Sequence, residues 1–582
     1  MRKSRRALKF SSLVVHGSII PILLAATSAA LAQATQPVVP QYNIGDAVRQ
    51  ADEARRDAPP STAGAPVLPR LVEPQLTLAD KSTLFVRRFA IEGPGLVGEA
   101  EIRAILGPYE NRKLTLAEIY DAADKITTLY RNQGYLLAKA YVPAQDARRG
   151  VLRIKIVPGK YGAIALKNES RVRDFFLQGV IDHALATSAY IHRDSLERAM
   201  LLISDLPGAG VPRVTIASGR QPETSDFAFD VPRGPLIDGY LLADNFGSPY
   251  TGRDRVSGGF NVNSPLGIGD RFSAFGLFAE ESHLDNGRLA YSLPIGYDGL
   301  RAEVAAFRTT YALGGIYQDL QSTGTAVGES ATLTYALRRR YDDSIYVSAS
   351  YAHKALDDDV LGASIANRTI DLGTLSVTRE TTGAIFGHPL ATSTTFSYTG
   401  GNVNFPDPIQ RAVNIAGVDT VGDYSRLNLT FLATVALNEK FSFSTNLRAQ
   451  KSLSGNLDSS EQLSLTGFWG VRSYDEGLAA DSGFVVTPEL KYALPDIRNY
   501  HHAIGVFTDV AAGWIENPSY TVTQNGYTQL NDVGLGYYAT YEYLPGRVLL
   551  LKALVAQTYG SNDGAQSYDR RTKGLVQIGS TF

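Results

Sequence analysis

The feature that most constrains this chain is an alternation of apolar and polar residues, with a period of two, that begins after Gly234 and continues to the C-terminus. Successive side chains of a β-strand point to opposite faces, so this pattern predicts strands with one apolar face. In one example, 426–437, the apolar face is formed by Leu427, Leu429, Phe431, Ala433, Val435 and Leu437. Turn residues such as Gly, Asn and Asp recur between such segments. Residues 234–582 are therefore expected to form a long series of antiparallel hairpins.

Two observations favour a membrane location for these hairpins, although a soluble sandwich would alternate in the same way. The segments have about the 9 to 11 residues that cross a bilayer at a tilt, and Tyr and Phe recur near their ends, as in an aromatic girdle. Open sheet edges cannot exist in lipid, so the sheet must close on itself. At typical barrel spacing the available residues give roughly 16 strands. The expected fold is mainly β, a transmembrane antiparallel β-barrel.

The N-terminus has the three parts of a secretory leader. A basic start, MRKSRR, precedes an apolar stretch that is broken by His16 and Pro21, and an Ala-x-Ala cleavage pattern follows at Ala30 and Ala32. Beyond that pattern, no uninterrupted apolar run reaches the roughly 18 residues that a transmembrane helix requires. Residues 1–32 are therefore expected to be a signal peptide, and the exported chain to be either soluble or a β-barrel.

Composition excludes several kinds of site. The chain has no cysteine, which excludes a disulfide scaffold and a thiolate metal site. The net charge is -2 and the basic residues are scattered, so charge gives no argument for a nucleic-acid partner. The eight histidines form no H-E-x-x-H or other ligand spacing, and we expect the His501-His502 pair to lie in a loop. No metal site and no cofactor are therefore expected.

Residues 33–82 combine a short amphipathic helix with a linker. Ile44, Val48 and Ala51 share one face of a helix predicted over 44–56, and charged residues cover the rest. The segment that follows, PPSTAGAPVLPRLVEP, is rich in Pro, Ser and Gly, which is typical of a linker. A small helix on a flexible tether is not expected to belong to a domain core.

The stretch between the linker and Gly234 repeats one small α+β architecture. In its first half, LFVRRFAIEG, YLLAKAYV and GVLRIKIV are predicted strands, and LTLAEIYDAADKITTLYRNQGY is a predicted helix that begins with a Thr115/Glu118 capping box and ends at Gly134. In its second half, the predicted strands are GAIALKN, VPRVTIAS and DFAFDVP, and the predicted helices are RDFFLQGVIDHAL and SLERAMLLISDLPG. Each half is long enough for one small core.

These segments resemble the two-partner secretion transporters, or hemolysin secretion/activation proteins, a branch of the barrel-assembly superfamily. RKLTLAEIYDAADKITTLYRNQGYLLAKAYVPAQDARRGVLRIKIVPGKYG is similar to the family's first polypeptide-transport-associated (POTRA) domain, and SLERAMLLISDLPGAGV to the hallmark helix of the second. LLADNFGSPYTGRDRVSGGFNVNSPLGIGD is similar to the first barrel hairpin. The resemblance implies a plug helix and linker at 33–82, POTRA domains at 83–160 and 161–233, and the β-barrel at 234–582.

The resemblance also implies a contact inside the barrel. In this superfamily the loop after the eleventh strand folds into the lumen and carries a Val-Arg-Gly-Tyr motif, whose arginine contacts an acidic residue of the inner wall. Here the loop motif is Val471, Arg472, Ser473 and Tyr474, and the wall motif, Phe-x-Asp-x-x-x-Gly, matches Phe507, Asp509 and Gly513. A carboxylate that accepts the planar fork of an arginine makes such a contact geometrically specific.

Two points about this motif stay open at the level of sequence. Ser473 replaces the family's glycine, and serine adopts positive φ only at a cost, so the motif does not guarantee the same backbone turn. The alternative for Arg472 is an exposed loop in which it pairs with Asp475 or Glu476.

The function that the resemblance implies is protein export across the outer membrane. The POTRA domains would lie in the periplasm and recognise a secreted exoprotein with an N-terminal secretion domain. Their exposed strand edges would accept an extended segment by β-augmentation. The exoprotein would then pass, unfolded, through the barrel, after the N-terminal helix that plugs it has left. The terminal Phe582 is similar to the signal read by the barrel-assembly machinery, with Val576 and Ile578 on the lipid side.

Three other classes of protein are alternatives to an exporter. A barrel-assembly insertase, the main alternative, usually carries more than the two POTRA units for which this chain has room. A passive porin needs no periplasmic domains. An enzyme on a barrel, such as a phospholipase, would need a nucleophile, and no G-x-S-x-G motif is present, so no enzymatic activity is expected.

Overall fold

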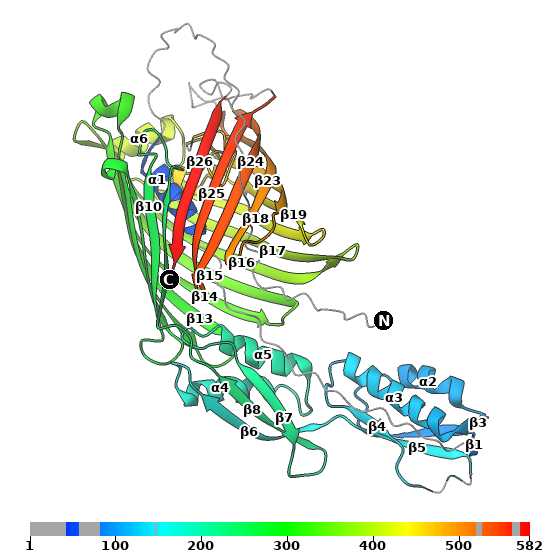
Figure 1. Ribbon diagram of the computed structural model, residues 1–582. Coiled ribbons are helices and arrows are strands. Elements are labelled where there is room, and N and C mark those ends of the chain that lie inside the picture. Colours follow the sequence, from blue (N-terminus) through cyan, green and yellow to red (C-terminus); the bar gives the residue numbers. More distant parts are fainter. Residues whose placement is uncertain are drawn as a thin grey trace.

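The computed structural model describes residues 42–57, 82–145, 147, 149–475, 477–518, 526–560 and 571–582. Figure 1 shows a large barrel with two small α+β domains following one another away from one of its ends. The expected signal peptide and most of the expected linker lie outside the described residues. Within the described residues, none of the helices is both long and apolar enough to cross a membrane.

The barrel is a single closed sheet of sixteen antiparallel strands. Each strand pairs with the next along the chain, and the last pairs with the first. The strands are β9 (Ile237–Asp244), β10 (Arg255–Asn263), β11 (Arg271–Ala279), β12 (Leu284–Ile295), β13 (Leu300–Ala312), β14 (Thr323–Arg338), β15 (Asp343–Val360), β16 (Ala363–Ile385), β17 (His388–Asn404), β18 (Gly422–Ala436), β19 (Phe441–Ser452), β22 (Ser482–Ala493), β23 (Tyr500–Trp514), β24 (Tyr527–Leu544), β25 (Arg547–Thr558) and β26 (Thr572–Thr581). The predicted barrel and its strand number are confirmed.

The barrel closes where β26 meets β9. Five residue pairs join the two strands, from Gln577 opposite Asp244 to Thr581 opposite Tyr240. Phe582 then continues the ladder, because its backbone exchanges two hydrogen bonds with Gly239, of 3.0 and 3.1 Å. No strand of the barrel is left with an open edge, as a bilayer requires.

The alternation in the sequence separates a lipid-facing surface from the lumen. Leu535 is 64% exposed and Ile578 is 57% exposed on the outer surface, whereas the neighbouring Gln577 is fully buried. On β19, the polar face directs Arg448 and Gln450 inward, where both are buried. The predicted two-faced strands are therefore confirmed. His501 and His502 correct one expectation, since they lie on β23 rather than in a loop, and Nε2 of His502 donates to the Pro495 carbonyl at 2.8 Å.

The first α+β domain contains a three-stranded sheet under two helices. Its sheet has the order β2-β5-β4, and a separate pair joins β1 to β3. The elements are β1 (Thr83–Val86), β2 (Arg88–Glu92), α2 (Glu99–Leu106), η2 (Gly107–Tyr109), β3 (Arg112–Thr115), α3 (Leu116–Asn132), β4 (Lys139–Tyr141) and β5 (Val151–Val157). Thr115 and Glu118 form the capping box of α3 that the sequence predicts.

One strand expected in this domain is in fact two. The predicted strand LFVRRFAIEG breaks at Arg87, and its halves join different partners, β3 and β5. The backbone amides of Arg87 and Arg88 both donate to the carbonyl of Gly150, at 2.7 and 3.2 Å, which turns the chain at this point. Of the expected strand YLLAKAYV, only Lys139–Tyr141 forms a β-strand.

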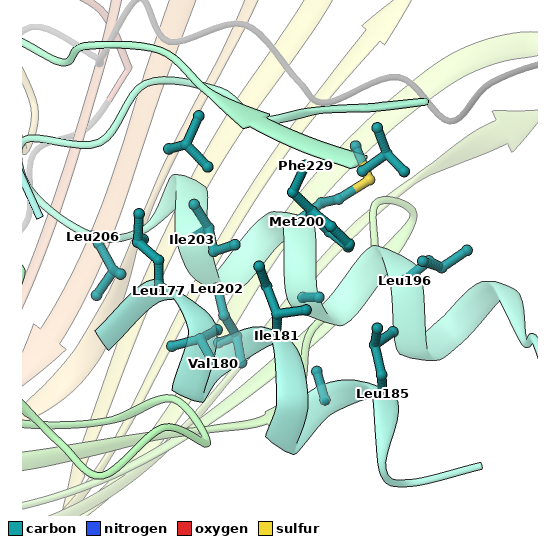
Figure 2. Close-up of a cluster of buried hydrophobic side chains, with 14 of the residues drawn as sticks. Leu177, Val180, Ile181, Leu185, Leu196, Met200, Leu202, Ile203, Leu206 and Phe229 are labelled. Atoms are coloured by element: carbon teal, nitrogen blue, oxygen red, sulfur yellow. The ribbon is translucent and has the colours of Figure 1, made fainter. Parts of the chain in front are cut away.

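The second α+β domain has the same plan, with sheet order β6-β8-β7. Its elements are β6 (Lys160–Asn168), α4 (Asp174–Leu185), α5 (Arg193–Ser204), β7 (Arg213–Ser218) and β8 (Thr224–Val231). Figure 2 shows α4 and α5 side by side, with Ile181, Met200 and Phe229 in the buried cluster between the helices and the sheet. This core lies against the barrel end from which the domain emerges.

Candidate functional site

A short helix occupies the barrel lumen. It is α1 (Ile44–Ala54), extended by η1 (Arg55–Asp57), and Figure 1 shows it inside the ring of strands. Asn43 caps its N-terminus in a capping box with Asp46. Its apolar face, through Ile44, Val48 and Ala51, is fully buried against apolar side chains of the wall, namely Leu277, Leu284, Tyr311, Leu313, Ala326, Leu356, Ile370 and Val403. The amphipathic helix predicted from the sequence thus packs against an apolar strip of an otherwise polar lumen. The expectation that it would not belong to a core was wrong, because its apolar face joins a buried cluster of the barrel wall.

The charged side of the helix is also paired. Glu53 accepts a hydrogen bond of 2.8 Å from Arg448 of β19, and both side chains are 7% exposed. Arg49 forms an ion pair of 2.5 Å with Asp46 on the same helix. At the N-terminus, the Ile44 amide donates to Asp358 of β15 at 2.8 Å. These contacts hold both ends of the helix to the wall.

The loop between β19 and β22 folds into the lumen beside the helix. Its first part contains η5 (Ser459–Glu461), and a short hairpin of β20 (Leu463–Ser464) and β21 (Ala479–Ala480) leads to and from its tip. The buried Glu461 accepts from Lys354 and from Arg426, each at 2.7 Å. The loop base is therefore tied to two separate strands of the wall.

A second buried cation holds the same part of the loop. Arg368 of β16 donates to Asp458 of the loop at 2.6 Å and to Asp358 of the wall at 2.9 Å. Its side chain is 4% exposed. Removing one partner of such a buried pair typically costs about 3–5 kcal/mol, because it leaves an uncompensated charge. The loop base is therefore held firmly.

At the loop tip, the structure brings together Arg472 and Asp509. The guanidinium donates to both carboxylate oxygens at 2.8 Å, and the Arg472 amide donates to the same group at 3.2 Å. The carboxylate is fully buried. Phe507, two residues earlier on β23, lies under the guanidinium, with 3.5 Å between its ring centroid and Cζ. Asp509 thus supplies a bidentate charge partner and Phe507 a stacking surface.

The serine of the motif is accommodated without strain. Ser473 is not among the described residues with positive φ, so the turn does not need the glycine that the family has at this position. Its amide donates to Asp532 of β24 at 2.7 Å. Asp475, the alternative partner of Arg472, instead pairs with Arg253 and Lys573, at 3.1 and 2.9 Å. Glu476 lies outside the described residues.

The remaining motif residues pack the tip against the wall. Val471 and Tyr474 are fully buried, in a cluster with Leu463, Leu465, Val485, Ala511 and Leu530. At Gly513 a Cβ atom would lie 2.6 Å from the Cβ of Ala480 and 2.9 Å from Leu465, closer than side chains tolerate. Gly513 therefore permits close approach of the hairpin that carries the loop tip.

Sequence reasoning missed several residues of this site. Arg426 and Arg448 alternate with apolar residues along their strands, but nothing in their spacing indicates Glu461 or Glu53 as partners. Asp532 carried no signal beyond its position in an alternating strand. Their partners are distant in the sequence and meet only because the loop and the helix enter the same lumen. Within the described residues, no group of three His, Asp or Glu side chains has an arrangement that could hold a metal ion.

Comparison with protein families gives two matches. The family model of the haemolysin secretion/activation protein ShlB/FhaC/HecB matches residues 223–537. The model of the POTRA domain of ShlB type matches residues 84–159, which is the first α+β domain. The first match includes the inward loop and most of the barrel.

Individual proteins give the same picture. The chain is 26% identical to the heme/hemopexin transporter protein HuxB of Haemophilus influenzae (strain 86-028NP) over 441 residues, which are 75% of this chain and 77% of that protein. It is 25% identical to the outer membrane transporter CdiB of Escherichia coli O6:K15:H31 over 255 residues, 42% of each chain. The solved structure of CdiB from Escherichia coli superimposes with a TM-score of 0.71 at 17% identity, covering 94% of this chain and all of that one. That structure shows the same fold.

Proposed function

Because the chain belongs to the haemolysin secretion/activation protein family, the two-partner secretion transporters of the outer membrane, we propose that it exports one partner exoprotein to the cell surface. The protein is an outer-membrane transporter whose POTRA domains lie in the periplasm. The exoprotein would bind these domains, enter the barrel unfolded and leave at the opposite end. The transporter itself would carry out no catalytic step and would need no cofactor.

The observation that carries this proposal is the way in which the lumen is filled. Helix α1 and the inward loop occupy it, and polar and charged contacts to the wall hold both. Such contacts can be exchanged for others, or for water, when an element moves within a polar pore. A chain that passes through the barrel must displace α1, so the filled lumen is the resting state of a conduit.

The POTRA domains offer edges to which an extended exoprotein segment can add. The sheet orders leave β2 and β4 at the edges of the first domain and β6 and β7 at the edges of the second. Backbone hydrogen bonds along such an edge give affinity, and side-chain pockets give selectivity. The second domain lies between the first and the barrel entrance, so a segment bound to either domain would be held near the pore.

The proposed role of the motif residues is to fix the loop tip for transport. Arg472→Ala would leave Asp509 buried without its cation and would free the tip, while the lipid-facing surface stays unchanged. Secretion of the partner exoprotein, normalised to folded barrel, should fall about tenfold or more, in keeping with the cost of breaking a buried pair. Asp509→Ala should have the same effect.

Because both residues serve one contact, the double variant should be little worse than either single variant. Arg547→Ala removes an exposed arginine at the start of β25 and serves as the control, with secretion expected to be unchanged. Additive losses would show that the two residues act separately. Full secretion by Arg472→Ala would contradict the role assigned to this contact.

Phe582 is proposed to contribute to recognition by the barrel-assembly machinery. Its backbone pairs with Gly239 at the closing seam, and the residue is 41% exposed. Deletion of Phe582 should lower the amount of heat-modifiable, folded barrel in the membrane, because both the terminal aromatic ring and two seam hydrogen bonds are lost. Unchanged assembly after the deletion would leave Phe582 as merely the last residue of the barrel.

A further inference from the structure

One guanidinium holds the plug helix and the inward loop at the same time. Arg448 donates through Nη1 to Glu53 of α1, at 2.8 Å. Through Nη2 it donates to two loop carbonyls, those of Trp469 at 2.6 Å and Ser464 at 3.1 Å. Trp469 closely precedes Arg472 in the loop. The side chain of Arg448 is 7% exposed, so water does not separate these contacts.

The other end of the helix meets the loop in the same manner. Ser459 of the loop donates from its hydroxyl to the side-chain oxygen of Asn43 at 2.5 Å, and its carbonyl accepts from Arg49. Asp358 accepts from the Ile44 amide and also from Arg368, which in turn holds the loop. Helix and loop therefore share contacts at both ends of the helix, rather than occupying separate sites on the wall.

Departure of the helix would change these shared contacts unequally. Among the described residues, Glu53 is the one carboxylate within ion-pair distance of Arg448. Without it, Arg448 would keep its two loop carbonyls but would have no counter-charge to orient its guanidinium. Arg368 would keep both of its carboxylates. The loop near Trp469 would therefore lose support, while the loop base would keep it.

We propose that Arg448 is a positioning residue that couples the plug helix to the loop tip. When α1 leaves, the guanidinium loses the carboxylate that orients it, releases the loop carbonyls, and the segment from Trp469 to Arg472 loosens. Coupling of this kind is reciprocal, so a loosened tip also weakens the hold on the helix. Opening of the pore and release of the Arg472–Asp509 contact are thus linked events.

Hydrogen exchange of the loop tip tests this coupling in the transporter alone. The backbone amides of Val471, Arg472 and Ser473 donate to Leu465, Asp509 and Asp532, so their protection reports the order of the tip. The full-length protein in phosphatidylethanolamine/phosphatidylglycerol nanodiscs would be compared with a variant that lacks residues 42–56. Deletion should accelerate exchange of the tip about tenfold, as expected for loss of a hydrogen bond to a charged group, while amides on β22 and β23 stay protected.

Point variants separate coupling from simple loss of the plug. Glu53→Gln should raise both single-channel conductance and tip exchange. Asp52→Asn is the matched control, because Asp52 lies beside Glu53 on the same helix, its side chain is 52% exposed, and its ion pair is with Arg55 of the same helix. This control should change neither the single-channel conductance nor the hydrogen exchange of the loop tip. Arg448→Lys keeps a positive charge for Glu53 but lacks the planar fork, so it should accelerate tip exchange with conductance near the parent value.

Two outcomes would overturn the proposal. The first is an unchanged exchange rate at the tip after deletion of the helix, in a barrel that remains heat-modifiable. The second is full additivity between the deletion and Arg448→Ala, since coupling through this residue requires that the deletion add little once Arg448 is gone. The test needs no exoprotein, so its failure would leave the proposed export function unaffected.

Discussion

The two POTRA domains have the same plan but differ in how they are attached. The core of the first domain is formed entirely by its own residues, from Leu84 to Ile156. The core of the second continues into the barrel, where Ala336 of β14 belongs to it and Tyr346 of β15 packs against it. One domain is therefore a self-contained unit, whereas the other shares its hydrophobic core with the barrel.

Ion pairs reinforce the attachment of the second domain. Arg198 of α5 donates to Asp298, in the turn between β12 and β13, at 2.8 Å, and to the Ala336 carbonyl at 3.1 Å. Arg339, in the turn between β14 and β15, donates to the two carboxylate oxygens of Asp205 through Nε and Nη2, each at 2.8 Å. Burial raises the pKa of Asp298, but hydrogen bonds from Tyr335 and Arg198 outweigh this effect and leave the pKa below its usual value. The docking contact therefore keeps its charges at neutral pH.

The junction between the two domains is slighter, although Leu136 and Leu137 of the first domain pack against the core of the second. The amide of Arg193 donates to the Gly134 carbonyl at 2.8 Å, and the ring of His192 meets that of Tyr135 edge-on at 5.1 Å. An ion pair of 2.7 Å joins Lys155 to Glu223, but both side chains are about two-fifths exposed, at 40% and 42%. Exposed pairs contribute little. We therefore expect the second domain to move with the barrel, and motion of the periplasmic part to be concentrated between the two domains.

The largest effect is expected from breaking the contacts that dock the second domain on the barrel. Arg198→Ala combined with Arg339→Ala removes the charge-assisted contacts of two turns, each worth about 1.5–3 kcal/mol. The second domain should then separate from the barrel in part of the population. Spin labels on α4 and on the β12–β13 turn would show a broadened distance distribution, and secretion should fall several-fold.

Arg213→Ala is the matched control for this experiment, because Arg213 is an exposed arginine on β7 of the same domain. This control should leave both the spin-label distance distribution and secretion unchanged. A narrow distance distribution in the double variant would show that apolar packing alone docks the domain, with Phe176 against Tyr297 at 5.2 Å between ring centroids.

A smaller effect is expected from changing the junction itself. Gly134 has φ of 98°, and a Cβ there would lie 2.5 Å from Nε2 of His192. Gly134→Ala should cost about 1–2 kcal/mol for the backbone strain and displace His192, shifting the first domain relative to the second. Spin labels on α3 and α5 would report this shift, with only a modest loss of secretion.

Gly95→Ala controls for the loss of a glycine in the same domain, because a Cβ at Gly95 meets nothing within 4 Å. An unchanged label distance in Gly134→Ala would mean that the junction tolerates displacement of His192. The contrast between a fixed second domain and a movable first domain would then rest on the docking contacts alone.

Much of the fold could be predicted from local pattern. The alternation after Gly234 determined the barrel, because each strand has one face in lipid and one in a polar lumen. The Thr115/Glu118 pair marked the start of α3 through a hydrogen-bonding pattern contained within one turn. The break at Arg87 was missed because it depends on Gly150, which reaches that point only after the domain has folded.

For the residues that line or enter the lumen, the sequence determined their chemical types, and the tertiary structure determined which residues they contact. The apolar face of α1, the inward polar faces of the strands and the motif residues Arg472 and Asp509 were all visible in the sequence. The contacts of Arg448 with Glu53 and of Asp532 with Ser473 were not. A strand pattern is set by neighbours two residues apart, whereas these pairs depend on the register around the closed sheet and on which segments enter the pore. Only closure of the barrel places residues so distant in the chain within hydrogen-bonding distance.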